Sequence, residues 1–465
     1  MIRHQARDIG GRIVRRDNLA RALLDRVQHP TQMVALGFGL AVLAGSLLLS
    51  LPVATTTGEP AGWLTALFTA TSAVCVTGLI VVDTPGHWSA FGEVVIALLI
   101  QIGGLGIMTM ATLLTLLISG RLGLRARLLA QTETKSMSMQ DVRRVLGRVV
   151  VFSLVCEAAV AAVLTARFLT GYGEPPGRAL YLGVFHAISA FNNAGFALWP
   201  DNLMGFVTDP WICLPIAVAV ILGGLGFPVV FELLRSWRRP GRWTIVTRIT
   251  VMLTVVLLLG GTLVFLFTEW HNPGTLGPLD GRGKALAAFF TAVMPRTAGF
   301  NSLDLAQLHP SSLLATDVLM FIGGGTAGTA GGIKVTTLGL VGYIVWAELR
   351  AESRVNVGHR RLAESAQRQT MTLITISAAL VVGSTYVLMV LTPHELNKVL
   401  FEVVSAFATV GLSTGITADI PAAGQVLLVL LMFVGRIGPL TLGSALALRE
   451  RTRRYELPVE RVVIG

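Results

Sequence analysis

Four glycines that each stand ten residues after a phenylalanine are the first candidate functional residues of this chain. The four segments are Phe68–Gly78 (FTATSAVCVTG), Phe185–Gly195 (FHAISAFNNAG), Phe289–Gly299 (FFTAVMPRTAG) and Phe401–Gly411 (FEVVSAFATVG). Each is an apolar run too short to cross a bilayer, and a longer apolar stretch follows within about fifteen positions. The glycines lie 117, 104 and 112 residues apart, which is enough for a unit of helix, re-entrant segment and helix. Non-helical backbone at membrane depth is tolerated where it lines a water-filled path, so the four turns predict one lined pore.

The triplets that end these segments are the candidate ion ligands. They are Val76, Thr77, Gly78; Asn193, Ala194, Gly195; Thr297, Ala298, Gly299; and Thr409, Val410, Gly411. A cation that loses its water needs a ring of oxygens, which inward-facing backbone carbonyls supply. Glycine allows the turn, and the short helix before it points its negative end at the pore. We therefore expect a K⁺ filter of backbone carbonyls; the competing interpretation is a set of tight turns between buried helices.

An acidic residue follows every triplet, at Asp83, Asp201, Asp304 and Asp419. These carboxylates could concentrate cations at an outer mouth. They could equally be helix N-caps or ordinary solvated loop residues.

The segment Phe321 to Lys334 (FIGGGTAGTAGGIK) interrupts a predicted span with six glycines in fourteen residues. So many glycines cannot sustain a helix, since each costs about 1 kcal/mol relative to alanine. We expect an internal loop that blocks or opens the path below the filter, formed by Gly323, Gly324, Gly325, Thr326, Ala327, Gly328, Thr329, Ala330, Gly331 and Gly332. A phosphate-binding P-loop is disfavoured because Ile333 separates glycine from Lys334. Lys334 itself would reach toward the cytoplasmic side or meet a carbonyl.

Arg436 is a charge at membrane depth. It takes the place that Gly104 and Gly224 have in the first two units. Such a charge is costly and is usually paired or faces a cavity, so beneath a filter it would repel ions or anchor a gating segment. A pair with a buried acid such as Glu157 or Glu232 is the alternative.

The elements that must position these residues are transmembrane helices. Of 465 residues, 53% are hydrophobic and only 14% charged, with a mean hydropathy of +0.69. This predicts an all-α polytopic membrane protein of four pseudo-repeats around one pore. The expected spans are 33–53, 90–118, 149–170, 211–234, 249–269, 313–346, 370–392 and 422–448, with short segments at 65–76, 180–192, 284–295 and 396–408. The units are a basic amphipathic segment at 1–30, repeats at 31–120, 121–240, 241–350 (with the loop 321–334) and 351–450, and a tail at 451–465.

The positive charges predict the orientation. Five connections hold 29 of the 37 lysines and arginines, and the other side holds few, among them Arg296. By the positive-inside rule both termini are cytoplasmic and the four turns open outward. This asymmetry accounts for the net charge of +11 without any nucleic acid. Cys75, Cys156 and Cys213 are isolated in apolar segments, which gives neither a disulfide framework nor a metal site.

Taken together, these motifs resemble the Trk, Ktr and HKT potassium transporters, most closely the membrane subunit of bacterial Ktr systems. The resemblance covers residues 30 to about 450 and rests on ALFTATSAVCVTGLIVVDT, LLIQIGGLGIMT, FNNAGF, PRTAGFNSLD, GGGTAGTAGGIKVTT, FATVGLSTG and GRIGPLT. It implies a pore-forming subunit for K⁺ uptake, stimulated by Na⁺ in some members, with no organic cofactor in this chain. Gly78 implies potassium, because a serine there goes with sodium selectivity in the plant branch. The family also implies a homodimer in the lipid of the bacterial inner membrane, docked on a cytosolic RCK-type ring that binds ATP or ADP.

Three other functions compete with a selective potassium pore. A less selective Na⁺/K⁺ pore would keep the same fold. A secondary transporter that alternates between two halves would predict two large repeats and acids at midplane. An enzyme would need a cluster of catalytic groups, and no histidine pairs with Cys, Glu or another His at metal-ligand spacing, so we expect a transporter without enzymatic activity.

Overall fold

The computed structural model describes residues 30–122, 139–352, 354–357 and 360–438. The predicted amphipathic segment at 1–30, apart from its last residue, and the tail at 451–465 lie outside this range. The described chain is helical apart from the short antiparallel pair β1 (Asn356–Val357) and β2 (Arg360–Arg361).

Each of the four units contains a long helix, a short helix that ends in a glycine turn, and a returning helix. The first has α2 (Pro30–Leu49), α3 (Trp63–Val74), α4 (Thr84–His87) and α5 (Ala90–Leu122). The second has α7 (Met139–Gly171), α8 (Pro176–Phe191), α9 (Pro210–Leu225) and α10 (Phe227–Ser236). The third has α11 (Ile245–Glu269), α12 (Gly281–Val293), α13 (Pro310–Phe321) and α14 (Val335–Leu349). The fourth has α15 (Glu364–Leu391), α16 (Leu396–Ala408) and α17 (Ala422–Ile437). Single 3-10 turns lie in the connections: η1 (Pro52–Ala54), η2 (Met204–Phe206), η3 (Pro240–Arg242), η4 (Leu305–Gln307) and η5 (Thr417–Asp419).

The long helices turn apolar side chains away from the protein. Phe267 of α11 is 88% exposed and Val390 of α15 is 71% exposed, as expected for surfaces that face lipid. By length and composition, three helices in the described chain could cross a membrane (residues 144–171, 245–269 and 364–391), and the bent pair α9 and α10 is a fourth if taken as one span. The other expected spans are shorter apolar helices or, in α5, extend into residues whose side chains are not described.

Glycine breaks two of the returning spans. The expected loop between α13 and α14 is present. The span expected at 211–234 is divided into α9 and α10, which meet at an angle of 103°. Gly226 stands at the bend with φ of 90°, a conformation that a side chain disfavours. The helix α17 ends before Gly438, and the rest of the span expected at 422–448 is not described.

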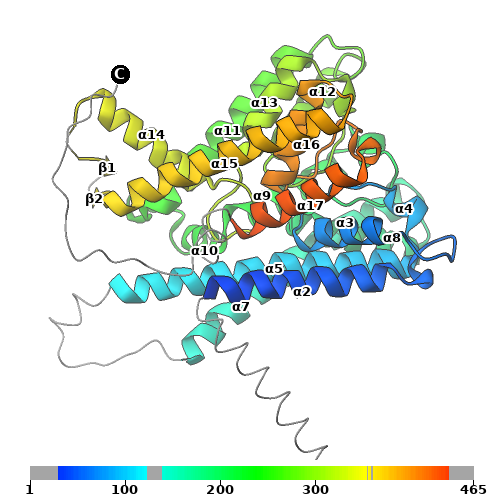
Figure 1. Ribbon diagram of the computed structural model, residues 1–465, viewed down its shortest axis with the longest axis horizontal. Helices are drawn as coiled ribbons and strands as arrows, with labels where there is room; N and C mark the ends of the chain where they lie inside the picture. The colour runs from blue at the N-terminus through cyan, green and yellow to red at the C-terminus, as the bar shows by residue number, and fades with distance from the viewer. Residues whose placement is uncertain (1–29, 123–138, 353, 358–359, 439–465) are drawn as a thin grey trace, which may run out of the picture.

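The four units close into a ring. The helix α5 packs on α8, α9 on α12, α13 on α16, and α17 on α3 of the first unit. Figure 1 shows the short helices α3, α8, α12 and α16 on the same side of the molecule, at the far end from β1 and β2. Buried side chains of neighbouring units share the apolar core, since one cluster joins units one and two and another joins unit four to its neighbours.

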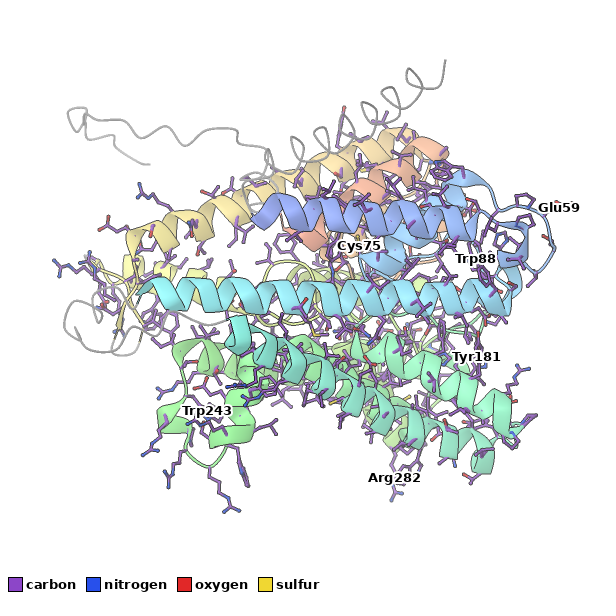
Figure 2. All side chains as sticks on the ribbon, turned by 90° about the horizontal axis from the view of Figure 1, so that it is seen from below. Glu59, Cys75, Trp88, Tyr181, Trp243 and Arg282 are labelled. Atoms are coloured by element: carbon purple, nitrogen blue, oxygen red, sulfur yellow. The ribbon has the colours of Figure 1, made fainter. Side chains whose placement is uncertain are left out.

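Polar connections lie at both ends of the long helices. Figure 2 shows Trp243, in the basic connection between α10 and α11, toward one end and Glu59 and Trp88 at the other. The predicted cytoplasmic connection at 235–248 and the predicted outer connection that holds Glu59 and Trp88 therefore lie at opposite ends of the helices, whereas their orientation in a membrane stays a prediction.

Candidate functional site

The four glycine turns meet around one axis. A Cβ added to Gly78 would lie 2.1 Å from the carbonyl oxygen of Ala194, and one on Gly195 would lie 2.6 Å from that of Ala298. The series continues from Gly299 to Val410 at 2.4 Å and closes from Gly411 to Thr77 at 2.0 Å. Each contact joins the glycine of one unit to the middle residue of the next triplet. Any side chain here would overlap a carbonyl of the neighbouring unit, so the close ring requires glycine.

The backbone of all four triplets has the same conformation. The first residue of each has a positive φ, of 55° at Val76, 61° at Asn193, 71° at Thr297 and 50° at Thr409. The closing glycines have φ between 72° and 91°, whereas the middle residues are not in this region. Alternation in the sign of φ turns successive carbonyls to one side of the chain, unlike the alternating sides of an extended strand. The repeated conformation therefore allows each triplet to line a common column with oxygens.

Hydrogen bonds from the short helices hold these turns. The Ser72 and Ser405 hydroxyls accept the N–H of Gly78 and Gly411 at 3.0 and 3.1 Å. Val293 occupies the same place in the third unit and has no hydroxyl, so that triplet is fixed differently, by the Ala298 N–H on the Met294 carbonyl at 3.0 Å. The turns are thus rigidly placed at the C-terminal ends of α3, α8, α12 and α16.

The column is buried and offers oxygen. All non-glycine residues of the triplets are 1% exposed or less. Within the described residues the hydroxyls of Thr77, Thr297 and Thr409 are buried without a hydrogen-bond partner. Together with the ring of carbonyls, these hydroxyls offer oxygen ligands of the kind that a dehydrated cation needs.

A hollow of about 350 Å³ lies outside the ring. Gly78 and Gly411 form part of its floor, and Asp83 and Asp201 are among its walls. Asp304 and Asp419 do not line it. Asp83 and Asp304 each cap a short helix, accepting the N–H of Gly86 at 2.9 Å and of Ala306 at 3.0 Å. Asp83 therefore both lines the hollow and caps a helix, so the interpretation as an outer-mouth carboxylate and the interpretation as an N-cap apply to it together.

The glycine-rich loop is tied to the bend of the second unit. The Gly325 N–H donates to the Gly224 carbonyl at 2.7 Å, and the Thr329 N–H donates to the Gly223 carbonyl at 3.1 Å. A Cβ on Gly325 would lie 2.0 Å from the Leu225 carbonyl oxygen, so the two backbones are in direct contact. The break in α9 and the loop of unit three are thus one structure.

The same loop touches two of the triplets. The Thr329 hydroxyl lies 3.0 Å from the Asn193 side-chain amide. A Cβ on Gly331 would be 2.0 Å from the Thr409 hydroxyl. The loop therefore lies directly against the first residues of the second and fourth triplets, on the side away from the outer hollow.

Two buried arginines hold this loop by its carbonyls. Arg436, 4% exposed, donates to the carbonyl of Thr329 and to that of Gly103, the latter at 3.4 Å. Arg296, 7% exposed, donates to the Gly323 carbonyl at 3.3 Å. Lys334 donates to the Ala330 carbonyl within the loop. These contacts agree with the hypothesis of an anchored segment.

Two expectations about charges are corrected. Arg436 does not pair with Glu157, whose carboxylate accepts from Gln101, Ser153 and Asn192. Nor does it pair with Glu232, which accepts from Thr244 and Thr247. Arg296, counted above among the outer charges, is buried beside the loop. Its position inside a repeated apolar segment, directly before Thr297, was the available signal.

Comparisons with known proteins identify the family. Residues 24–450 match the TrkH model, described as cation transport protein. The chain is 40% identical over 427 residues to Ktr system potassium uptake protein B of Bacillus subtilis, covering 92% of this chain and 95% of that protein. It is 34% identical to the potassium/sodium uptake protein NtpJ of Enterococcus hirae, covering 94% and 97%. The crystal structure of the potassium transporter TrkH from Vibrio parahaemolyticus superposes with a TM-score of 0.69 at 18% identity, covering 89% of this chain and 85% of that one. These findings confirm the expected resemblance and the helical membrane-transporter fold, and the matched proteins are ion transporters, not enzymes.

Proposed function

This chain belongs to the TrkH family of cation transport proteins, and on that basis we propose that it is the pore-forming subunit of a potassium uptake system. Potassium passes through the ring formed by the four triplets. The carbonyl oxygens replace the hydration shell of the ion, and the Thr297 and Thr409 hydroxyls add ligands at the inner end. The observation that carries this function is the closed series of glycine-to-carbonyl contacts between successive units.

The loop 323–332 is the gate of this pore. It lies against the second and fourth triplets and is held in place by backbone bonds to Gly223 and Gly224 and by Arg436. Displacement of the loop, which breaks these hydrogen bonds, would open the path. Asp83 and Asp201 raise the cation concentration in the outer hollow.

The relatives support the identity of the ions and partners. Three of the matched proteins are named Ktr system potassium uptake proteins, and one is named a potassium/sodium uptake protein. Sodium is thus the second ion to test as a stimulant or as a competing substrate. A Ktr system implies a partner subunit, for which we propose a nucleotide-binding cytosolic ring beneath a homodimer, with both termini of this chain cytoplasmic.

The experiment that tests the function measures K⁺ and Na⁺ uptake by the purified protein in liposomes. Serine in place of Gly78, Gly195, Gly299 or Gly411 puts a side chain against a neighbouring carbonyl. We expect a loss of K⁺ over Na⁺ discrimination of at least roughly tenfold, the factor that about 1.4 kcal/mol of displaced ligand corresponds to. Gly342→Ala in α14 is the control, because a Cβ there meets nothing within 4 Å. Unchanged discrimination in all four serine variants would end the proposal.

A further inference from the structure

One position of the repeated segment differs chemically in every unit. It directly follows the phenylalanine that opens each segment, and its occupants are Thr69, His186, Phe290 and Glu402. All four side chains are 2% exposed or less. They therefore lie behind the ring of triplets, within the body of the protein, where a polar group without a partner costs free energy.

In the fourth unit Glu402 binds the segment that leaves the ring. Its carboxylate accepts the N–H of Thr414 at 3.2 Å, the hydroxyl of Thr417 at 3.0 Å, and the hydroxyl of Ser413. Ser413 and Thr417 also line the outer hollow. A carboxylate with no exposed surface thus fixes the wall of the hollow and the chain directly after Gly411.

In the second unit His186 makes the matching contact. Its Nδ1 donates to the Leu182 carbonyl at 2.7 Å, which leaves Nε2 to accept the N–H of Leu198 at 3.2 Å. Its ring also stacks on Trp199, with centroids 4.4 Å apart. Leu198 and Thr414 are each the third residue after the glycine of their triplet. An imidazole and a carboxylate therefore hold the same backbone N–H in two units.

The first and third units lack this contact. The Thr69 hydroxyl is buried without a partner among the described residues, and Phe290 has no acceptor. Since the contacts around the ring run from unit one to two, three and four, the two units in which a side chain accepts this N–H face each other across the axis.

We propose that Glu402 and His186 are positioning residues for ion selectivity. They hold the chain at the outer end of two opposed triplets and so keep the carbonyls of Gly195 and Gly411 directed at the ion. The inference rests on the proposed function and extends it. Selectivity in a carbonyl ring depends on how many oxygens face the ion and how firmly they are held. Loss of the acceptor leaves a buried N–H unpaired, which favours a rearrangement of this segment.

The test compares K⁺ and Na⁺ uptake by the full-length protein in liposomes. Glu402→Leu and His186→Phe keep volume and remove the acceptors, and each is expected to lower the K⁺ to Na⁺ ratio roughly fivefold to tenfold, the factor for one lost hydrogen bond of ordinary strength. Glu402→Gln keeps an oxygen for the Thr414 N–H, so its ratio should stay closer to wild type. If Glu402→Leu does not fold, Ser413→Ala with Thr417→Val removes the partner hydroxyls and should shift the ratio in the same direction.

Thr69→Val is the matched control, because it changes the same position in the first unit, where the Thr69 hydroxyl has no partner among the described residues. Its ratio should equal that of wild type. The inference is overturned if Glu402→Leu and His186→Phe keep the wild-type ratio, or if Thr69→Val lowers it as much as they do. When the glycine variants lose selectivity but Glu402→Leu and His186→Phe do not, only this inference fails. Unchanged selectivity in both sets removes the proposed function as well.

Discussion

Three β-branched residues carry an unusual backbone conformation. Val76, Thr297 and Thr409 have positive φ, which such side chains rarely adopt. Each costs about 1–3 kcal/mol and persists only where the surroundings determine it. Here the preceding helix and the next unit do so, because every triplet contacts its neighbour. The strained residues are those whose carbonyls must turn inward. The packing of the units therefore maintains a backbone conformation that is disfavoured for these residue types in isolation.

Arg436 separates two hypotheses about the charge below the ring. As an anchor it acts through its bonds to the Thr329 and Gly103 carbonyls, and as a barrier it acts through its charge alone. Lysine keeps the charge but not the planar fork that reaches two carbonyls. We expect Arg436→Lys to raise K⁺ uptake nearly as much as Arg436→Gln, by about tenfold for one lost charge-assisted bond. Initial uptake rates in liposomes measure this.

A comparison of the two Arg436 variants also gives the result that would contradict the anchor hypothesis. If lysine behaves as wild type while glutamine raises the flux, the positive charge is what limits the ion. Selectivity should stay unchanged in both, since neither carbonyl belongs to a triplet.

Among the elements, the loop between α13 and α14 is the one whose backbone lies in direct contact with itself and with the fourth triplet. A Cβ on Gly323 would lie 2.1 Å from the Gly331 carbonyl oxygen, and one on Gly331 would meet Thr409. Alanine at either position therefore prevents the loop from seating. We expect Gly323→Ala and Gly331→Ala to raise K⁺ uptake several-fold, and a shortened loop between 323 and 332 should do the same. The reason is that a closed state destabilised by roughly 1 kcal/mol raises the open fraction of the protein by that factor.

Glycines elsewhere provide the comparison. Gly383 in α15 has nothing within 4 Å of an added Cβ, so Gly383→Ala should leave the flux unchanged. Uptake that stays at the wild-type rate in both loop variants would remove the gate assignment.

The sequence predicted those elements whose signal is local. The spacing from phenylalanine to glycine located the short helices, and 396–408 coincides with α16. The glycine content located the loop. The partners of the loop were not predictable, because Gly223 and Thr329 lie on different units and no pattern encodes their register. The angle of the bend at Gly226 was not predictable for the same reason, since its neighbour Thr326 belongs to the loop. Arg296 was misplaced because a charge beside an apolar segment usually marks its exposed end.

At the scale of the whole molecule, a basic surface lies at one end of the long helices, away from the ring of triplets. A hollow of about 650 Å³ beside α10 is lined by four exposed arginines, namely Arg235, Arg238, Arg239 and Arg242. Trp243, in the same connection, lies toward this end, and Arg282 lies toward the other (Figure 2). Glu232, the acid among the lining residues, already accepts bonds from Thr244 and Thr247. None of the four arginines forms an ion pair with another described residue, so this surface offers positive charge to an acidic partner.

We expect charge reversal here to separate regulation from permeation. Arg238→Glu with Arg239→Glu should leave uptake by the isolated subunit unchanged, because neither side chain contacts the ring or the loop. Stimulation by an added cytosolic nucleotide-binding subunit should fall at least tenfold, because two like charges that face each other across an interface cost several kcal/mol. Uptake by liposomes with and without that subunit measures both quantities. Arg282→Glu, at the opposite end, controls for net charge and should respond as wild type. If stimulation persists in the double variant, the partner docks elsewhere, and the basic connection serves only to orient the chain in the membrane.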